Sequence, residues 1–169
     1  MSVIEHTLSW IRGEIVEHTA VGIFGLSIAA LAALFWRFGS VPTARGLVLP
    51  FVLVGALFVV LGASGIYTNT QRGAAYQQRH AEDPAAFAGA ETARVEGFLA
   101  WYPYTLGAAS ILIVAGLVLF NLTGGPTARG TSLALILVGF GGLMIDNVSE
   151  SNAKRYRAAL ASHDEGLGD

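Results

Sequence analysis

The chain has no cysteine and few charged side chains. Without cysteine it has no disulfide, no thiolate nucleophile, no iron–sulfur cluster and no cysteine-ligated zinc. Only 13% of its 169 residues are charged and 53% are hydrophobic, whereas about 25% of the residues of a soluble domain are charged. The net charge of −2 gives no electrostatic reason to expect nucleic acid as a partner. So few charges cannot cover a surface that faces water.

The charged residues are also unevenly spread. Four stretches contain none, at 19–36, 46–71, 97–128 and 130–145. Each is long enough, or nearly so, to cross about 30 Å of hydrocarbon as a helix. We therefore predict an all-α integral membrane protein, a four-helix bundle with spans at 19–36, 46–68, 98–120 and 130–146.

Helical patterns continue outside these spans. Residues 1–17 have an apolar stripe typical of an amphipathic helix, which either lies at the bilayer interface or packs against the protein's own helices. Asp83 and Pro84 are typical of a helix N-cap and first position, so residues 70–96 are expected to form a helical hairpin outside the membrane. We expect a further helix at 150–161 and a mobile tail at 162–169.

The two halves of the chain are related in sequence. The segment 42–46 (PTARG) recurs at 126–130, an offset of 84 residues, and each copy leads into the second span of a pair. The sequence thus predicts an internal repeat of about 1–83 and 84–169, each copy a helical hairpin. Two spans per copy put both hairpins in the membrane in the same sense, around a pseudo-two-fold axis along the membrane normal.

The basic residues predict the orientation. With four spans, both termini and the central connection share one side. That side holds seven of the ten basic residues and the other side three, Arg37, Arg45 and Arg129. By the positive-inside rule, both termini are expected in the cytoplasm.

Ionisable residues gather at the cytosolic ends of the spans, and the middle third of every span has none. This pattern argues against a proton relay or a voltage sensor. We interpret five of these residues as a structural network of ion pairs, with carboxylates at helix N-termini: Arg12, Glu14, Glu17, Arg94 and Glu96. No catalytic residue is assigned.

A sharper hypothesis concerns a metal ion. Glu14 and His18 lie one helical turn apart, and Asp146 ends the fourth span, so these three side chains could ligate a divalent cation. No other cofactor is predicted.

Short motifs resemble those of a known group of proteins. They are the segment 12–15 (RGEI), the segment 35–39 (FWRFG) followed by Pro42, and Ile145 with Asp146. In these the chain resembles small bacterial four-span proteins that are usually described as hypothetical. The resemblance implies a bacterial inner-membrane location and supplies no activity or ligand.

Three classes of function remain open. The first is a non-enzymatic interaction, assembly or scaffold protein, whose basic residues contact lipid headgroups, a second copy or another membrane protein: Arg72, Lys154, Arg155 and Arg157. The second is a small membrane metalloprotein or enzyme that uses the polar site at the cytosolic interface. The third is a component of a small transporter or channel, with its path along the pseudo-axis.

Overall fold

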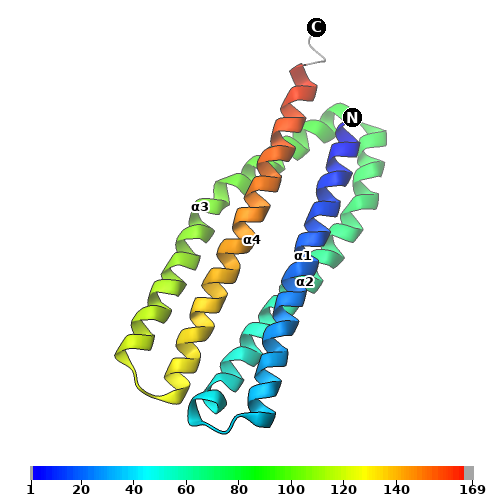
Figure 1. Cartoon of the computed structure of the whole chain (residues 1–169). Helices are drawn as coiled ribbons and strands as arrows, with labels where there is room; N and C mark the ends of the chain where they lie inside the picture. Colours follow the sequence, from blue (N-terminus) through cyan, green and yellow to red (C-terminus); the bar gives the residue numbers. More distant parts are fainter. Residues whose placement is uncertain (1, 166–169) are drawn as a thin grey trace.

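The computed structural model describes residues 2–165, with side chains up to residue 162. This part of the chain forms four long α-helices and no strand (Figure 1), which confirms the all-α prediction. The helices are α1 (Val3–Phe38), α2 (Pro42–Glu82), α3 (Pro84–Leu122) and α4 (Pro126–Glu165).

Local sequence explains where the helices begin. Helices α2, α3 and α4 each start on a proline, a residue whose fixed φ suits the first helical position and whose missing N–H is not needed there. The Asp83 carboxylate accepts a 3.0 Å hydrogen bond from the backbone N–H of Ala86, so it caps α3 as predicted. At the start of α1, the Ser2 N–H donates to the Glu5 carboxylate over 2.8 Å.

Each helix runs without a break through the predicted segments. From Val3 onward, the amphipathic segment and the predicted span 19–36 form one helix, and the helix of the predicted span 130–146 continues through 150–161. Extending an existing helix by one residue costs less than nucleating a new one, and nothing in these junctions interrupts the backbone hydrogen bonds. Residues 162–165, expected in a mobile tail, are the last turn of α4, and residues 166–169 lie outside the described part.

The helices form two hairpins with the same orientation. The short connections at 39–41 and 123–125 lie together at one end, here called the loop end, and both chain termini lie toward the other, here called the terminal end (Figure 1). The first hairpin is α1 with α2, and the second is α3 with α4. Helix α4 packs against both helices of the first hairpin.

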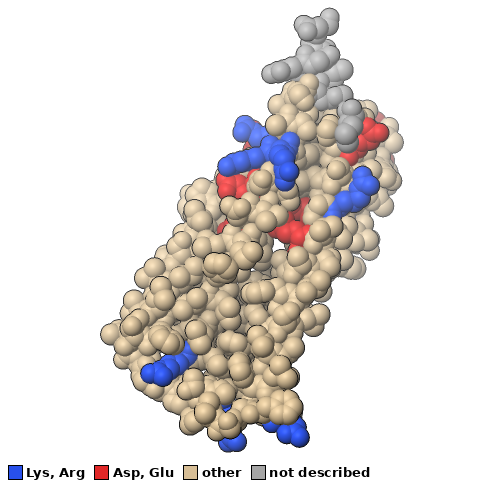
Figure 2. Space-filling model, in the orientation of Figure 1, with Lys and Arg blue, Asp and Glu red and all other residues tan. Residues whose placement is uncertain are grey.

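All four helices are long and apolar enough to cross a membrane. Large hydrophobic side chains are exposed along them, and charged side chains gather toward the terminal end, with a few basic ones at the loop end (Figure 2). With 36 to 41 residues each, the helices are about 54–62 Å long at 1.5 Å per residue. That is roughly twice the 30 Å hydrocarbon thickness, so these are the helices of a multi-pass membrane protein with a large extension.

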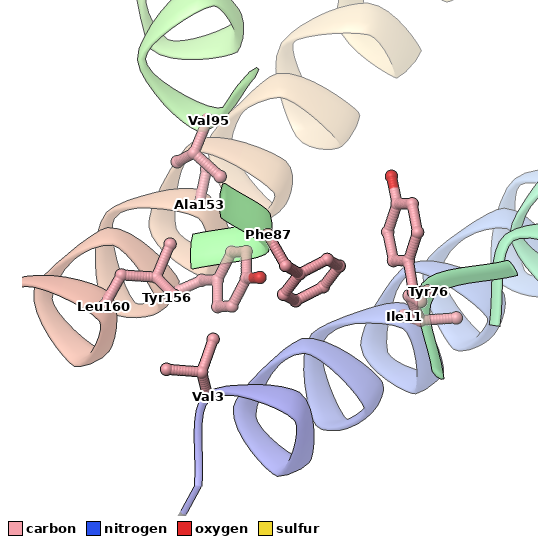
Figure 3. Close-up of a cluster of buried hydrophobic side chains, with 8 residues drawn as sticks. All are labelled: Val3, Ile11, Tyr76, Phe87, Val95, Ala153, Tyr156 and Leu160. Atoms are coloured by element: carbon pink, nitrogen blue, oxygen red, sulfur yellow. The ribbon is translucent and has the colours of Figure 1, made fainter. Parts of the chain in front are cut away.

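Two groups of buried side chains hold the helices together. One lies within the expected spans and includes Val21, Ile28, Phe51 and Phe58. The other lies at the terminal end, where all four helices meet (Figure 3): Val3, Ile11, Tyr76, Phe87, Val95, Ala153, Tyr156 and Leu160. We call this second group the terminal core. Because Val3 and Ile11 belong to it, the amphipathic segment packs against the protein's own helices.

Glycines allow the closest helix contacts in the spans. A Cβ on Gly25 would lie 2.7 Å from the carbonyl oxygen of Gly55, and one on Gly139 would lie 2.6 Å from the carbonyl oxygen of Ala109. These contacts join α1 to α2 and α3 to α4 at a distance that larger residues prevent. At the loop end, the backbone of Gly46 in α2 meets Gly130 at the start of α4.

Candidate functional site

A buried ion pair lies beside the terminal core. The Arg94 guanidinium donates to the Glu91 carboxylate through Nε (3.0 Å) and Nη2 (2.6 Å), three residues along α3. Residue Glu91 is only 4% exposed. The Arg94 Cζ lies 4.4 Å from the centroid of the Trp10 ring of α1, which stabilises the cation further.

Tyr156 of α4 connects this pair to α1. Its hydroxyl donates to Glu91 over 3.1 Å and forms a second hydrogen bond, 2.6 Å long, with the hydroxyl of Thr7. Its ring stacks on Trp10 with the ring centroids 5.4 Å apart. Burial raises the pKa of Tyr156, so its hydroxyl stays a neutral donor. The network links α1, α3 and α4 through side chains of the protein itself, which indicates a structural role. The buried Nη1 of Arg94 and Nε1 of Trp10 have no hydrogen-bond partner among the described residues.

A different polar site lies between the terminal core and the spans. It is a cavity of ≈ 260 Å³ whose walls come from all four helices. Most of the lining residues are polar: Glu14, Glu17 and His18 of α1, Ser64, Thr68, Asn69 and Arg72 of α2, and Ser149 of α4, with Phe98 of α3 and Ile145 of α4 as apolar members. We call it the polar cavity.

His18 is held firmly in the wall of the polar cavity. Its Nδ1 lies 2.7 Å from the Glu14 carbonyl oxygen and donates to it, because a carbonyl can only accept. The ring lies against Gly65 of α2, where any Cβ would collide with it. Glycine at position 65 therefore makes the room that this histidine occupies.

The two glutamates in the cavity lack close cationic partners. Residue Glu14 is 8% exposed, and neither Glu14 nor Glu17 belongs to the three ion pairs found among residues 2–162. Burial raises the pKa of Glu14, against the opposing charges of His18, Arg94 and Arg72. Burial, with smaller effects from the charges of Glu14 and Asp146, raises the pKa of Glu17 to about 7. Both side chains therefore favour a proton or a cation nearby.

Asn69 adds an unpaired acceptor to the same cavity. This residue is 3% exposed, and its Nδ2 donates to the Gly65 carbonyl oxygen over 3.0 Å. That bond leaves Oδ1 without a hydrogen-bond partner within the described protein, and the same is true of Oε2 of Glu17. A buried acceptor without a donor costs about 1–3 kcal/mol. Two residues that line the polar cavity, Asn69 and Glu17, thus each hold a buried acceptor without a donor, which a ligand reaches once the side chain turns toward the cavity.

The five residues predicted to form one structural network lie in several places. Arg94 pairs with Glu91 and not with another member of the set, and Glu96 pairs with Arg157 over 2.8 Å. Glu14 and Glu17 both line the polar cavity, and Arg12 is exposed. The carboxylates are not at helix N-termini, because α1 and α3 begin well before them.

The predicted metal ligands are only partly brought together. Glu14 and His18 line the polar cavity, while Asp146 lies outside its wall and acts on Glu17 through its charge. Residues 2–162 contain no cluster of three or more histidine, aspartate or glutamate side chains arranged to hold a metal ion.

The four residues predicted to contact lipid headgroups or a partner lie in two different places. Arg72 lines the polar cavity. The other three are exposed on α4, where Lys154 pairs with Glu150 over 2.7 Å, Arg155 donates to the amide oxygen of Asn152 over 2.7 Å, and Arg157 pairs with Glu96.

Sequence reasoning missed Glu91, Tyr156 and the role of Asn69. Glu91 had a readable signal, since it lies three residues before Arg94 and therefore on the same helix face. Tyr156 had none, because its contacts join residues 65 and 149 positions apart in the chain. No protein-family model, curated protein or solved structure shows significant similarity to the chain. The function must therefore be argued from the site itself.

Proposed function

We propose that the protein is an integral membrane protein of the bacterial inner membrane, with both termini in the cytoplasm and two tandem, like-oriented hairpin repeats. Equivalent contacts at the 84-residue offset support the repeat. Gly25 meets Gly55 in the first hairpin, and Ala109 meets Gly139 in the second. Gly46 and its equivalent Gly130 meet each other, as equivalent residues do beside a two-fold axis.

Its function, we propose, is that of an interaction or assembly protein whose cytoplasmic extension binds a partner. The terminal core supports this proposal most directly. A protein that only spans a bilayer needs helices of about 30 Å, yet these continue for a similar length and have a second hydrophobic core with the buried pair of Glu91 and Arg94. Ordering so many extra residues costs conformational entropy. A rigid surface outside the membrane that binds a partner would explain why the protein keeps these residues ordered.

The two alternatives have less support. Transport along the pseudo-axis requires space between α2 and α4, and at the loop end these helices are in backbone contact at Gly46 and Gly130. The geometry of Glu14, His18 and Asp146 adds no support to the metalloprotein hypothesis. Elemental analysis of the purified protein tests that hypothesis directly.

Site-specific photocrosslinking in intact cells tests the proposed interaction. A photoreactive amino acid replaces Arg155, which is exposed on the extension, or Ile111, which is exposed within the expected third span. We expect a discrete protein adduct, from a second copy or another protein, at position 155 and lipid adducts only at position 111. Protein adducts absent from position 155 and from its neighbours on α4 would refute an interaction through this surface.

The absence of native cysteine makes the orientation easy to test. Single cysteines at exposed Arg155 and exposed Arg45 lie at opposite ends of the helices. A reagent that cannot cross the inner membrane should label position 45 in intact spheroplasts and position 155 only after lysis. The reverse pattern contradicts cytoplasmic termini.

A further inference from the structure

An apolar groove adjoins the polar cavity along the membrane-spanning part. It has a volume of ≈ 190 Å³ and lies between α1 and α4. Its walls include Ala20, Val21 and Phe24 of α1 and Gly141 and Met144 of α4. Glu17 and Ile145 line both spaces, so the groove and the polar cavity adjoin at these two residues.

The two spaces lie at different depths in the expected membrane. The groove residues 20–24 and 141–145 belong to the predicted spans 19–36 and 130–146, within the hydrocarbon. The polar cavity is built from the ends of the spans and the first turns beyond them, at the depth of lipid headgroups. A polar site with an adjoining apolar groove in this direction matches a lipid, with its headgroup at the interface and an acyl chain in the hydrocarbon.

The polar residues specify the headgroup. Glu14, Glu17 and Asn69 carry acceptor oxygens, and two of these atoms are unpaired, so the cavity favours a ligand with hydrogen-bond donors. The carboxylates favour a cation. A primary ammonium group has three donors and a positive charge, whereas a trimethylammonium group has the charge and no donor.

Arg72 supplies the opposite charge in the same cavity. It is half-buried in the cavity wall and belongs to none of the ion pairs among residues 2–162. A guanidinium is suited to bind a phosphate. Carboxylates, an amide oxygen and an arginine in one cavity thus match a ligand that carries both a primary ammonium group and a phosphate.

We propose that the polar cavity and the α1–α4 groove together bind one phospholipid with an aminoethyl phosphate headgroup. The ammonium group lies among Glu14, Glu17 and Asn69, the phosphate contacts Arg72, and an acyl chain occupies the groove. Water-soluble aminoethyl phosphates share the headgroup chemistry, but the adjoining groove favours the lipid.

Native mass spectrometry on the full chain in detergent tests the proposal. The protein is titrated with phosphatidylethanolamine and with its N-methylated and N-trimethylated forms, which keep the positive charge while each methyl group replaces one N–H donor. We expect affinity to fall stepwise with methylation, by about tenfold or more in total, because each lost hydrogen bond weakens binding. Equal affinity across the series overturns the assignment of the headgroup.

Soluble glycerophosphoethanolamine forms the second arm, measured as displacement of the bound lipid. We expect it to displace the lipid only at concentrations at least about a hundredfold higher, because it lacks the apolar chains. Displacement at equal concentration would show that the ligand is the free headgroup and that the groove has no part in binding.

Two variants separate the cavity from the groove. Asn69→Leu removes the unpaired acceptor at similar volume and should abolish the preference for the unmethylated lipid. Ala20→Phe fills the groove and should weaken all the lipids together, while Ala30→Phe, at another exposed alanine of α1 outside the groove, should not. Binding by Ala20→Phe equal to that of Ala30→Phe would refute the groove. The methylation series on the unaltered protein remains decisive if a variant does not fold.

Discussion

Replacing Glu91 with glutamine is the strongest perturbation that the structure suggests. Glu91 is 4% exposed and accepts hydrogen bonds from both Arg94 and Tyr156. The Glu91→Gln change leaves the Arg94 cation without its counter-charge, and only 21% of that side chain is exposed. Breaking a buried ion pair costs about 3–5 kcal/mol. We expect about 3 kcal/mol, the lower end, because the Trp10 ring still contacts the cation.

A double variant identifies the cause of that loss. Glu91→Leu combined with Arg94→Met removes both charges and keeps side chains of similar size. Replacing a buried ion pair by apolar residues is often neutral or stabilising, so we expect the double variant to lie within about 1 kcal/mol of the unaltered protein. The double variant is thus expected to be more stable than Glu91→Gln, although it carries more changes.

Hydrogen exchange measured by mass spectrometry is the suitable assay, because it reports local opening in detergent without global unfolding. A loss of about 3 kcal/mol speeds exchange roughly a hundredfold. This should appear in peptides covering 84–100 and 150–161, and peptides from the expected third span serve as the internal control. If the double variant exchanges as fast as Glu91→Gln, the loss comes from packing, and the argument from buried charge is refuted.

Two further changes test the polar cavity. Gly65→Ala should displace the ring of His18 and cost about 1–3 kcal/mol of stability, measured as a lower melting temperature by tryptophan fluorescence. The control is Gly73→Ala, which lies in open space and should be neutral or stabilising. Equal effects of the two substitutions would contradict the contact between Gly65 and His18. The pKa of Glu17 is raised from 4.5 to about 7, so the folded state holds this proton more tightly than the unfolded state. Stability should therefore fall as pH rises through this interval, less steeply in Glu17→Gln, and a slope unchanged in that variant would refute the role of Glu17.

Sequence patterns alone identified the features that depend on local chemistry. The four apolar stretches predicted membrane-spanning helices, because a chain in hydrocarbon must satisfy its backbone hydrogen bonds within the helix. Asp83 and Pro84 located a helix start to the residue, since capping depends only on neighbours a few positions away. The sequence left open whether the amphipathic segment lies at the bilayer interface or packs against the protein, and α1 is one helix from Val3 to Phe38. Polar residues near position 18 do not interrupt this helix, because they remove no backbone hydrogen bond.

The contacts that form the site depend instead on how the helices are placed relative to one another. Whether Glu14 and Arg72 line one cavity, whether Tyr156 reaches Glu91, and whether a groove adjoins the polar cavity depend on the register and rotation of one helix against another. In the spans, that register follows from close glycine contacts such as Gly25 with Gly55. Such contacts join residues far apart in the chain, and glycine is common throughout membrane helices. Composition and periodicity therefore determine which segments become helices, and packing between them determines which side chains form a site.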